Sequence, residues 1–168
     1  MTTPRHRLPH AFLSLMLVVV PTAQAVEVVE GVWRISTIAR DSVQEPNRDP
    51  QPSLLVFTAG HYSMVWTPTD EAMRAYAERW SPTDDEKIKR HSEVVVNAGT
   101  YEIKGSQIKT FPLVARDPDL IDGYVLYEYK WLDGNLVLTM VDEYSFDGVQ
   151  HPWVKRGRIH LTLSRVSE

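Results

Sequence analysis

Four histidines lie beyond residue 25, and histidine is the side chain best suited to proton transfer or metal binding near neutral pH. They are His61, His91, His151 and His160. No two of them stand at a metal-ligand spacing such as His-x-His or His-x-x-x-His, and the chain has no cysteine that would add a thiolate. The sequence therefore predicts no metal site, and we expect each histidine to be a structural or surface residue.

Motifs for nucleophilic catalysis or nucleotide binding do not occur in the sequence. No serine lies in Gly-x-Ser-x-Gly, and there is neither Gly-x-Gly-x-x-Gly nor a Walker-type loop. We therefore predict no cofactor and assign no catalytic residue. Among the acidic residues, Asp142 and Glu143 end one predicted strand, and Glu128 lies within another. Glu128 alternates with aromatic residues, so we expect it to face solvent on the outer side, together with Lys130.

Aromatic side chains form the most informative pattern. In two predicted strands, alternate residues are aromatic or methionine and share one face, because successive side chains of a strand point to opposite sides. Tyrosine and tryptophan combine apolar area with a polar tip, which suits the wall of a ligand pocket. The opposite orientation would put His61, Ser63 and Val65 inside, with His61 as the titratable group. The candidate ligand-binding residues are Tyr62, Met64, Trp66, Tyr101, Tyr127, Tyr129, Trp131 and His61.

These residues belong to short extended segments joined by glycine turns. Residues 53–58 and 61–67 are rich in β-branched and aromatic residues and meet at Ala59-Gly60, where glycine supplies the positive φ of a tight hairpin. The arrangement recurs around Gly105 and around Asp133-Gly134, the latter a strong type I′ turn signal. We expect strands at residues 31–39, 53–58, 61–67, 97–103, 107–113, 123–132, 135–142 and 155–166, with loops at 41–52, 115–123 and 144–152.

Eight short strands joined mainly by hairpins predict an all-β fold, an eight-stranded antiparallel up-and-down barrel. Closure of the barrel, which removes exposed strand edges, is favoured by the abundance of simple hairpins. The interior of such a barrel holds side chains or one small ligand. A two-layer sandwich is the alternative, and in it the same aromatic faces would be packed core.

The segment from residue 67 to residue 92 departs from the strand pattern and predicts a short helical insertion after the third strand. We expect Thr69 to cap a first helix whose apolar residues continue at helical spacing to Trp80. Thr83 and Glu86 form the capping box of a second helix that runs to about Ser92. The two helices would lie over one mouth of the sheet or on its outside.

The first 25 residues have the features of a cleaved signal peptide. Arg5 and Arg7 form a positive head, residues 11–20 are an apolar run, and Ala23-Gln24-Ala25 has the small-x-small pattern of a cleavage site. We expect a secreted or periplasmic protein, cleaved after Ala25, with residues 26–168 as one barrel domain. The apolar run is too short to span a bilayer, which takes about 20 residues, and no later segment is predicted to cross a membrane.

Charge and composition narrow the expected partners. Removal of the leader takes two of the 18 basic residues and none of the 22 acidic ones, which leaves a net charge of −6. A mildly acidic surface disfavours nucleic acid, because phosphate binding requires basic patches. With no cysteine the fold has no disulfides and must rely on its core. We expect a small hydrophobic ligand as the partner, and the sequence does not indicate an oligomeric state.

Gly31-x-Trp33 on the first predicted strand, with Arg165 on the last, resembles the lipocalin signature. In that superfamily the tryptophan closes the barrel floor and an arginine of the final strand stacks across it, a contact worth roughly 0.5–2 kcal/mol. The resemblance covers residues 31–166 and implies a calycin-type barrel with a central cavity. The second and third conserved regions of secreted animal lipocalins are not found, so retinoid-style transport is not implied. Three segments are more specifically similar to the bacterial and fungal lipocalin-like domain family: Gln51–Thr58, His61–Met64 and Asn97–Tyr101.

Three hypotheses about function follow. The first is an exported lipocalin-like protein that binds a small apolar or aromatic molecule in the barrel cavity. The alternative is a cofactor-independent isomerase, cyclase or lyase, in which His61 or Glu128 transfers a proton and Tyr62 donates a hydrogen bond. Solvent-facing His61 and Glu128 would remove the machinery of that enzyme. The third is a barrel with a filled interior that works through its surface.

Overall fold

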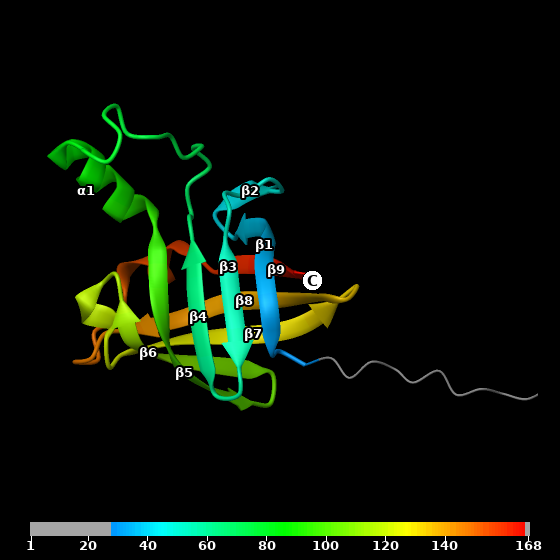
Figure 1. The fold of residues 1–168 in the computed structure, drawn as a ribbon. Helices are drawn as coiled ribbons and strands as arrows, with labels where there is room; N and C mark the ends of the chain where they lie inside the picture. Colours follow the sequence, from blue (N-terminus) through cyan, green and yellow to red (C-terminus); the bar gives the residue numbers. More distant parts are fainter. Residues whose placement is uncertain (1–27, 167–168) are drawn as a thin grey trace, which may run out of the picture.

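The computed structural model describes residues 28–166, in which eight strands close into an antiparallel barrel (Figure 1). Neighbouring strands follow chain order from β3 to β9, and β1 pairs with both β3 and β9. The predicted all-β barrel is confirmed, and the sandwich is excluded. The predicted signal peptide, residues 1–25, lies outside the described residues. The barrel strands are β1 (Gly31–Arg40), β3 (Leu54–Thr58), β4 (His61–Trp66), β5 (Val95–Lys104), β6 (Gln107–Ala115), β7 (Tyr124–Leu132), β8 (Asn135–Tyr144) and β9 (Ile159–Arg165).

Tight turns set the strand register, as the sequence predicts. At Asp133 and Gly134 φ is +50° and +76°, the two positive values of a type I′ turn. Gly60, with φ of +78°, joins β3 to β4 so that Thr58 pairs with His61. In Figure 1 the front strands β1, β3 and β4 run steeply across β7 and β8 at the back, as the twisted strands of a small barrel do.

One of the two predicted helices forms. In the described residues α1 (Asp84–Glu93) lies between β4 and β5 and stands at the top of the molecule in Figure 1. Its capping box is the predicted one: the Glu86 N–H donates to the Thr83 hydroxyl, and the Thr83 N–H donates to the Glu86 carboxylate at 2.8 Å. This confirms the helical insertion and its start.

The other predicted helix, capped by Thr69, is wrong, because residues 70–80 are irregular. Its apolar residues have no surface to pack against: Met73 is 45% exposed and Trp80 is 98% exposed. A helix of about ten residues is marginal in water unless tertiary packing covers its apolar face. Apolar residues at helical spacing are therefore not enough to form a helix in this segment.

Two further segments differ from the prediction. Residues 41–52, expected as a loop, contain a short strand, β2 (Val43–Asn47), which pairs with the end of β1. Pro46 is tolerated in β2 because this strand has no second neighbour among the described strands. The last strand begins at residue 159, since residues before it form a short 3₁₀ helix, η2 (Pro152–Arg156). Another, η1 (Pro118–Leu120), lies in the loop between β6 and β7.

A β-bulge in β1 changes which side chains enter the barrel. Trp33 faces inward, and strict alternation from it would put Ile38 and Arg40 outside. The register with β9 shifts at Ser36, which is the extra residue. Ile38 is therefore 2% exposed, and Arg40 reaches the barrel interior.

Two further bulges act in the same half of the barrel. In β8 Val141 is the extra residue, so Glu143 lies opposite Val125, which is buried. In β6 Leu113 is the extra residue, and Gly99 of β5 lies beside this bulge. A Cβ at Gly99 would come 2.0 Å from the carbonyl oxygen of Phe111, so the close approach of the two strands requires glycine.

The end of the barrel at which β1 begins is filled. Trp33 has no exposed surface, and its indole N–H donates to the carbonyl oxygen of Val29 at 2.9 Å. The Arg165 guanidinium lies 4.3 Å from the Trp33 ring centroid, and Trp131 lies 5.8 Å from it. A Cβ at Gly31 would come 2.3 Å from Arg165 Nη1. This is the floor contact that the lipocalin resemblance implies.

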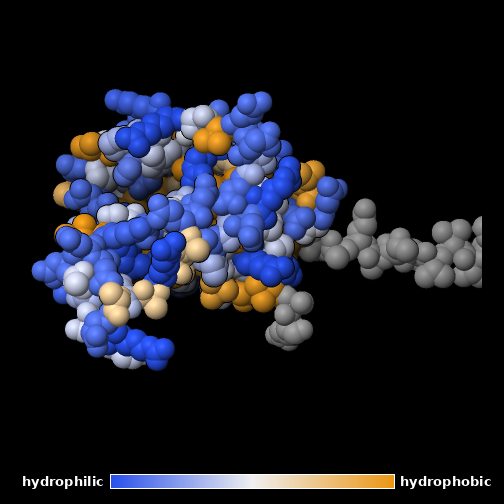
Figure 2. All heavy atoms as spheres, turned by 90° about the horizontal axis from the view of Figure 1, so that it is seen from above, coloured by the Kyte–Doolittle hydropathy of each residue, from blue (hydrophilic) through white to orange (hydrophobic). Residues whose placement is uncertain are grey.

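The face seen from above in Figure 2 is mainly hydrophilic, with hydrophobic side chains in small separate groups. Scattered apolar side chains of this kind are ordinary on a protein surface. No helix within residues 28–166 is long and apolar enough to cross a membrane.

Candidate functional site

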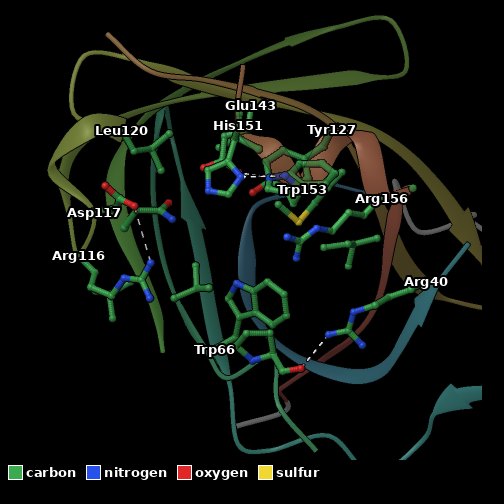
Figure 3. Close-up of a pocket in the computed structure, with 18 of the residues that line it drawn as sticks. Arg40, Trp66, Arg116, Asp117, Leu120, Tyr127, Glu143, His151, Trp153 and Arg156 are labelled. Carbon is green, nitrogen blue, oxygen red and sulfur yellow. Dashed lines mark hydrogen bonds and ion pairs between the residues drawn. The ribbon is translucent and has the colours of Figure 1, made fainter. Parts of the chain in front are cut away.

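The end of the barrel opposite Trp33 holds a pocket of about 550 Å³ (Figure 3). Its wall comes from the last residues of β1, β4 and β8 and the first residues of β5, β7 and β9, with η2 and the segment after β6 at the rim. Pockets that hold small molecules in proteins have volumes of about 300–1,000 Å³. The barrel therefore has a filled end and an end with room for a ligand.

The inner wall of the pocket is apolar. Trp66, Val125, Tyr127 and Met140 line it, and each is less than a tenth exposed. The Tyr127 hydroxyl contacts the sulfur of Met64 at 3.6 Å. Burial raises the pKa of Tyr127 well above its ordinary value, so this hydroxyl stays neutral. The deep part of the pocket offers apolar contact and no charge.

Besides Asp117, which lies after β6, the pocket is lined by a second acidic residue, Glu143 of β8. Burial raises the pKa of its carboxyl, and the nearby Asp117 carboxylate acts in the same direction. The hydrogen bond from the Trp153 indole N–H opposes this rise, as do the charges of His151 and Arg116. A carboxyl with a raised pKa keeps its proton to a higher pH than an ordinary glutamate, and in its protonated form it can donate a hydrogen bond or a proton to a molecule in the pocket.

The short helix η2 places two of these groups. His151 caps η2, because its Nδ1 accepts the Trp153 backbone N–H at 3.1 Å. The His151 backbone N–H donates to the Glu143 carbonyl oxygen at 2.9 Å. The end of β8 and the start of η2 are thus tied together at the pocket rim.

Arg116 holds the end of α1 against the rim. Its Nη1 donates to the carbonyl oxygens of His91 and Val94 at 2.8 and 2.9 Å. Its Nη2 lies 3.9 Å from the Asp117 carboxylate. Arg116 Nη1 is therefore hydrogen-bonded within the protein, and its positive charge lies beside the Asp117 carboxylate.

Arg40 and Arg156 also line the pocket, and their side chains extend toward its interior in Figure 3. Arg40 donates from Nη2 to the carbonyl oxygen of Pro68 at 2.7 Å. Within residues 28–166 neither arginine lies within ion-pair distance of a carboxylate. Two positive charges at the pocket are therefore not neutralised by an ion pair.

Asn97 adds an uncharged polar group to the pocket wall. It is 3% exposed, and its side-chain oxygen has no hydrogen-bond partner among the described residues. A buried acceptor without a partner costs about 1–3 kcal/mol. A donor on a bound molecule would satisfy it.

The pocket brings together two of the eight residues selected from the sequence, Trp66 and Tyr127. Tyr62 and Met64 face inward on β4 with Trp66, but they belong to the packed core and do not line the pocket. The alternation predicted for β4 is confirmed, and the opposite orientation is wrong. Only the residues nearest the open end reach the space.

Tyr101, Tyr129 and Trp131 lie toward the filled end and pack, partly buried, against the core. The Tyr101 hydroxyl donates to the carbonyl oxygen of Thr58 at 2.9 Å, and its ring meets Phe57 edge-on at 5.3 Å. None of the three lines the pocket. Their aromatic character serves the closed floor of the barrel in this structure.

His61 and Glu128 face solvent. His61 is exposed on β4, with Nδ1 3.4 Å from the carbonyl oxygen of Ala59. Glu128 pairs with Arg158 at 3.2 Å on the outside, where the sequence predicted it. The enzymatic hypothesis in its original form therefore has no acid or base in the cavity.

Several pocket residues were not selected from the sequence. Asn97 had a signal, because it shares the inward face of β5 with Tyr101 by the two-residue period. For Arg40 and Glu143 the two-residue period predicts an outward position, and only the bulges in β1 and β8 turn them inward. Trp153 lies on η2, which the sequence suggested would be loop and strand. Within residues 28–166 no group of three or more His, Asp or Glu side chains is placed to hold a metal ion.

Comparison of the chain with protein-family models, with curated proteins and with solved structures finds no match in any of the three. The fold is therefore assigned from the arrangement of its strands. Eight antiparallel strands close into a barrel, with a tryptophan and an arginine from the first and last strands packed at its floor. This architecture is compatible with a calycin-like fold.

Proposed function

We propose that this protein binds a small molecule with an apolar body in the pocket at the open end of the barrel. The observation that carries the proposal is the pocket itself: about 550 Å³ of space, lined at its inner end by buried apolar and aromatic side chains. Moving a ligand's apolar surface from water into such a site is favourable by about 25 cal/mol per Å². Asn97 supplies a polar contact point that nothing in the described chain uses.

The proposal extends to family and location. Gly31, Trp33 and Arg165 support assignment to the lipocalin-like proteins, since their packing at the floor is the arrangement that the resemblance implies. Export through the leader follows from residues 1–25 alone. Mass spectrometry of the protein recovered from its native host tests the export proposal, and a mature chain beginning at Val26 is the expected result.

A matched pair of variants tests binding. Val95 lines the pocket, whereas Val65 lies on the outer face of β4 and is 41% exposed. A neutral fluorescent probe such as N-phenyl-1-naphthylamine should bind the protein saturably. We expect Val95→Trp to weaken that binding by about tenfold or more, because the indole fills the space, while Val65→Trp leaves it unchanged. Equal effects of the two substitutions, or no saturable binding at all, would rule out the pocket as the site.

A second function, cofactor-independent proton-transfer catalysis, is favoured by Glu143. Its partly buried carboxyl lines the pocket, whereas His61 and Glu128 face solvent, and its raised pKa suits a general acid. A ligand identified by mass spectrometry can be incubated with the protein in deuterated water. Deuterium exchange at a carbon of the bound ligand that is lost in Glu143→Gln, with ligand affinity retained, would establish this activity. Exchange unaffected by the substitution would refute it.

A further inference from the structure

The pocket is apolar at its deep end and charged at its rim. Its deep part, near Tyr127 and Met140, is buried and apolar, while the charged residues lie where strands end or beyond them. Arg40 is the last residue of β1, and Arg156 is the last residue of η2. A molecule in this pocket would therefore meet apolar side chains at one end and guanidinium groups at the other.

Arg40 and Arg156 place positive charge at the pocket rim although the whole chain has a net charge of −4. Asp41 follows Arg40 directly, but its carboxylate accepts hydrogen bonds from the Arg158 backbone N–H at 3.0 Å and contacts His160 Nε2 at 2.9 Å. It therefore forms no ion pair with Arg40. Two carboxyls line the pocket itself: the partly buried Glu143, which burial holds toward its neutral form, and Asp117, which lies 3.9 Å from Arg116 Nη2 and not within ion-pair distance of Arg40 or Arg156.

The remaining donors of these arginines suit an oxyanion. Arg40 uses one Nη2 donor on the Pro68 carbonyl, and no described residue hydrogen-bonds to the Arg156 guanidinium. A guanidinium binds carboxylate and phosphate through two parallel N–H donors, and such charge-assisted bonds are stronger than neutral ones. Figure 3 shows both side chains reaching the pocket from the same side.

We propose that the ligand is an amphipathic anion, whose carboxylate or phosphate head is bound by Arg40 and Arg156 and whose apolar body lies against Trp66, Tyr127 and Met140. This inference rests on the proposed binding function and adds the chemical class of the ligand. It also sets the ligand's direction, with the head at the rim and the body toward the barrel centre.

Three probes of equal chain length test it: decanoate, decyl phosphate and decanol, titrated calorimetrically below their aggregation concentrations. We expect at least one of the two anions to bind about tenfold or more tightly than decanol, and this advantage to shrink as salt is raised. The order of decanoate and decyl phosphate identifies the preferred head group. Decanol affinity equal to that of both anions would overturn the inference while leaving the proposed binding function intact. Binding of none of the three would overturn both.

Variants assign the head-group contact to the two arginines. Arg156→Gln and Arg40→Gln should each weaken binding of the preferred anion by about fivefold or more and leave decanol affinity unchanged, which also shows that the pocket is still folded. Arg158→Gln is the matched control, because it removes the same charge from the outer surface, where Arg158 pairs with Glu128. An equal loss of anion affinity in Arg158→Gln would mean that net charge, and not the pocket, selects the ligand, and would overturn the inference.

Discussion

At the scale of single residues, Glu143 is the side chain whose surroundings matter most for the chemistry of the pocket. Burial raises the pKa of its carboxyl, and the charged groups that face it are Asp117, Arg116 and His151. In the unfolded chain a glutamate loses its proton near pH 4.3. Between that pH and the higher native pKa the folded protein binds more protons than the unfolded chain, so this residue makes stability fall as pH rises.

Glu143→Gln should therefore stabilise the protein at neutral pH by on the order of 1 kcal/mol, because glutamine keeps an oxygen for the Trp153 indole and does not ionise. The gain should vanish below about pH 4 and grow as pH rises through the window. Urea unfolding at several pH values measures it. Glu128→Gln, on the outer surface, is the control and should change stability little. A gain independent of pH would contradict the proposed cause.

At the scale of elements, three bulges set what the open end of the barrel contains. Each adds one residue to a strand and reverses the facing of the residues that follow. Ser36 brings Arg40 inside, and Val141 brings Glu143 inside. The third bulge, at Leu113, depends on a glycine in the neighbouring strand, because the two backbones come too close for a Cβ.

Gly99→Ala should therefore destabilise the barrel by about 2–4 kcal/mol, since its Cβ would meet the backbone of β6 and not a movable side chain. Gly105→Ala is the comparison, because a Cβ there meets open space and the cost of about 1–2 kcal/mol comes from its positive φ alone. Urea denaturation of both variants gives the ranking. A smaller loss in Gly99→Ala than in Gly105→Ala would show that the strands separate easily at the bulge.

At the scale of the whole molecule, the barrel divides into an end that stabilises the fold and an end that holds the pocket. The floor is tied by Arg165, whose guanidinium stacks on Trp33 and donates to the carbonyl oxygens of Glu30 and Val28 at 3.1 and 3.0 Å. No floor residue lines the pocket. Stability and ligand affinity should therefore respond to different substitutions.

Arg165→Gln should lower the free energy of unfolding by about 1–2 kcal/mol and leave the affinity for a pocket ligand unchanged. Trp66→Leu, in contrast, should weaken ligand binding, because Trp66 forms part of the pocket wall. Urea unfolding and probe titration on the same samples separate the two effects. Arg34→Gln, on the exposed face of β1, controls for loss of charge. A large loss of ligand affinity in Arg165→Gln would show that the two ends are coupled.

By itself, the sequence determined the barrel, because its signals are local. Alternating β-branched and aromatic residues specify strands, and turns such as Asp133-Gly134 specify which strands pair. The same local rules placed the capping box at Thr83 and the inward face of β4. They misjudged residues 70–80, where helical spacing was present but no surface was available to cover it.

Only the tertiary structure decided the pocket. Whether an inward aromatic residue lines space or fills it depends on its distance from the floor, which is why Trp66 lines the pocket and Trp131 does not. Arg40 and Glu143 enter the barrel because one residue in each strand has no partner opposite it, and that mismatch exists only between paired strands. Residue periodicity is a property of one strand, whereas a cavity is a property of all eight together.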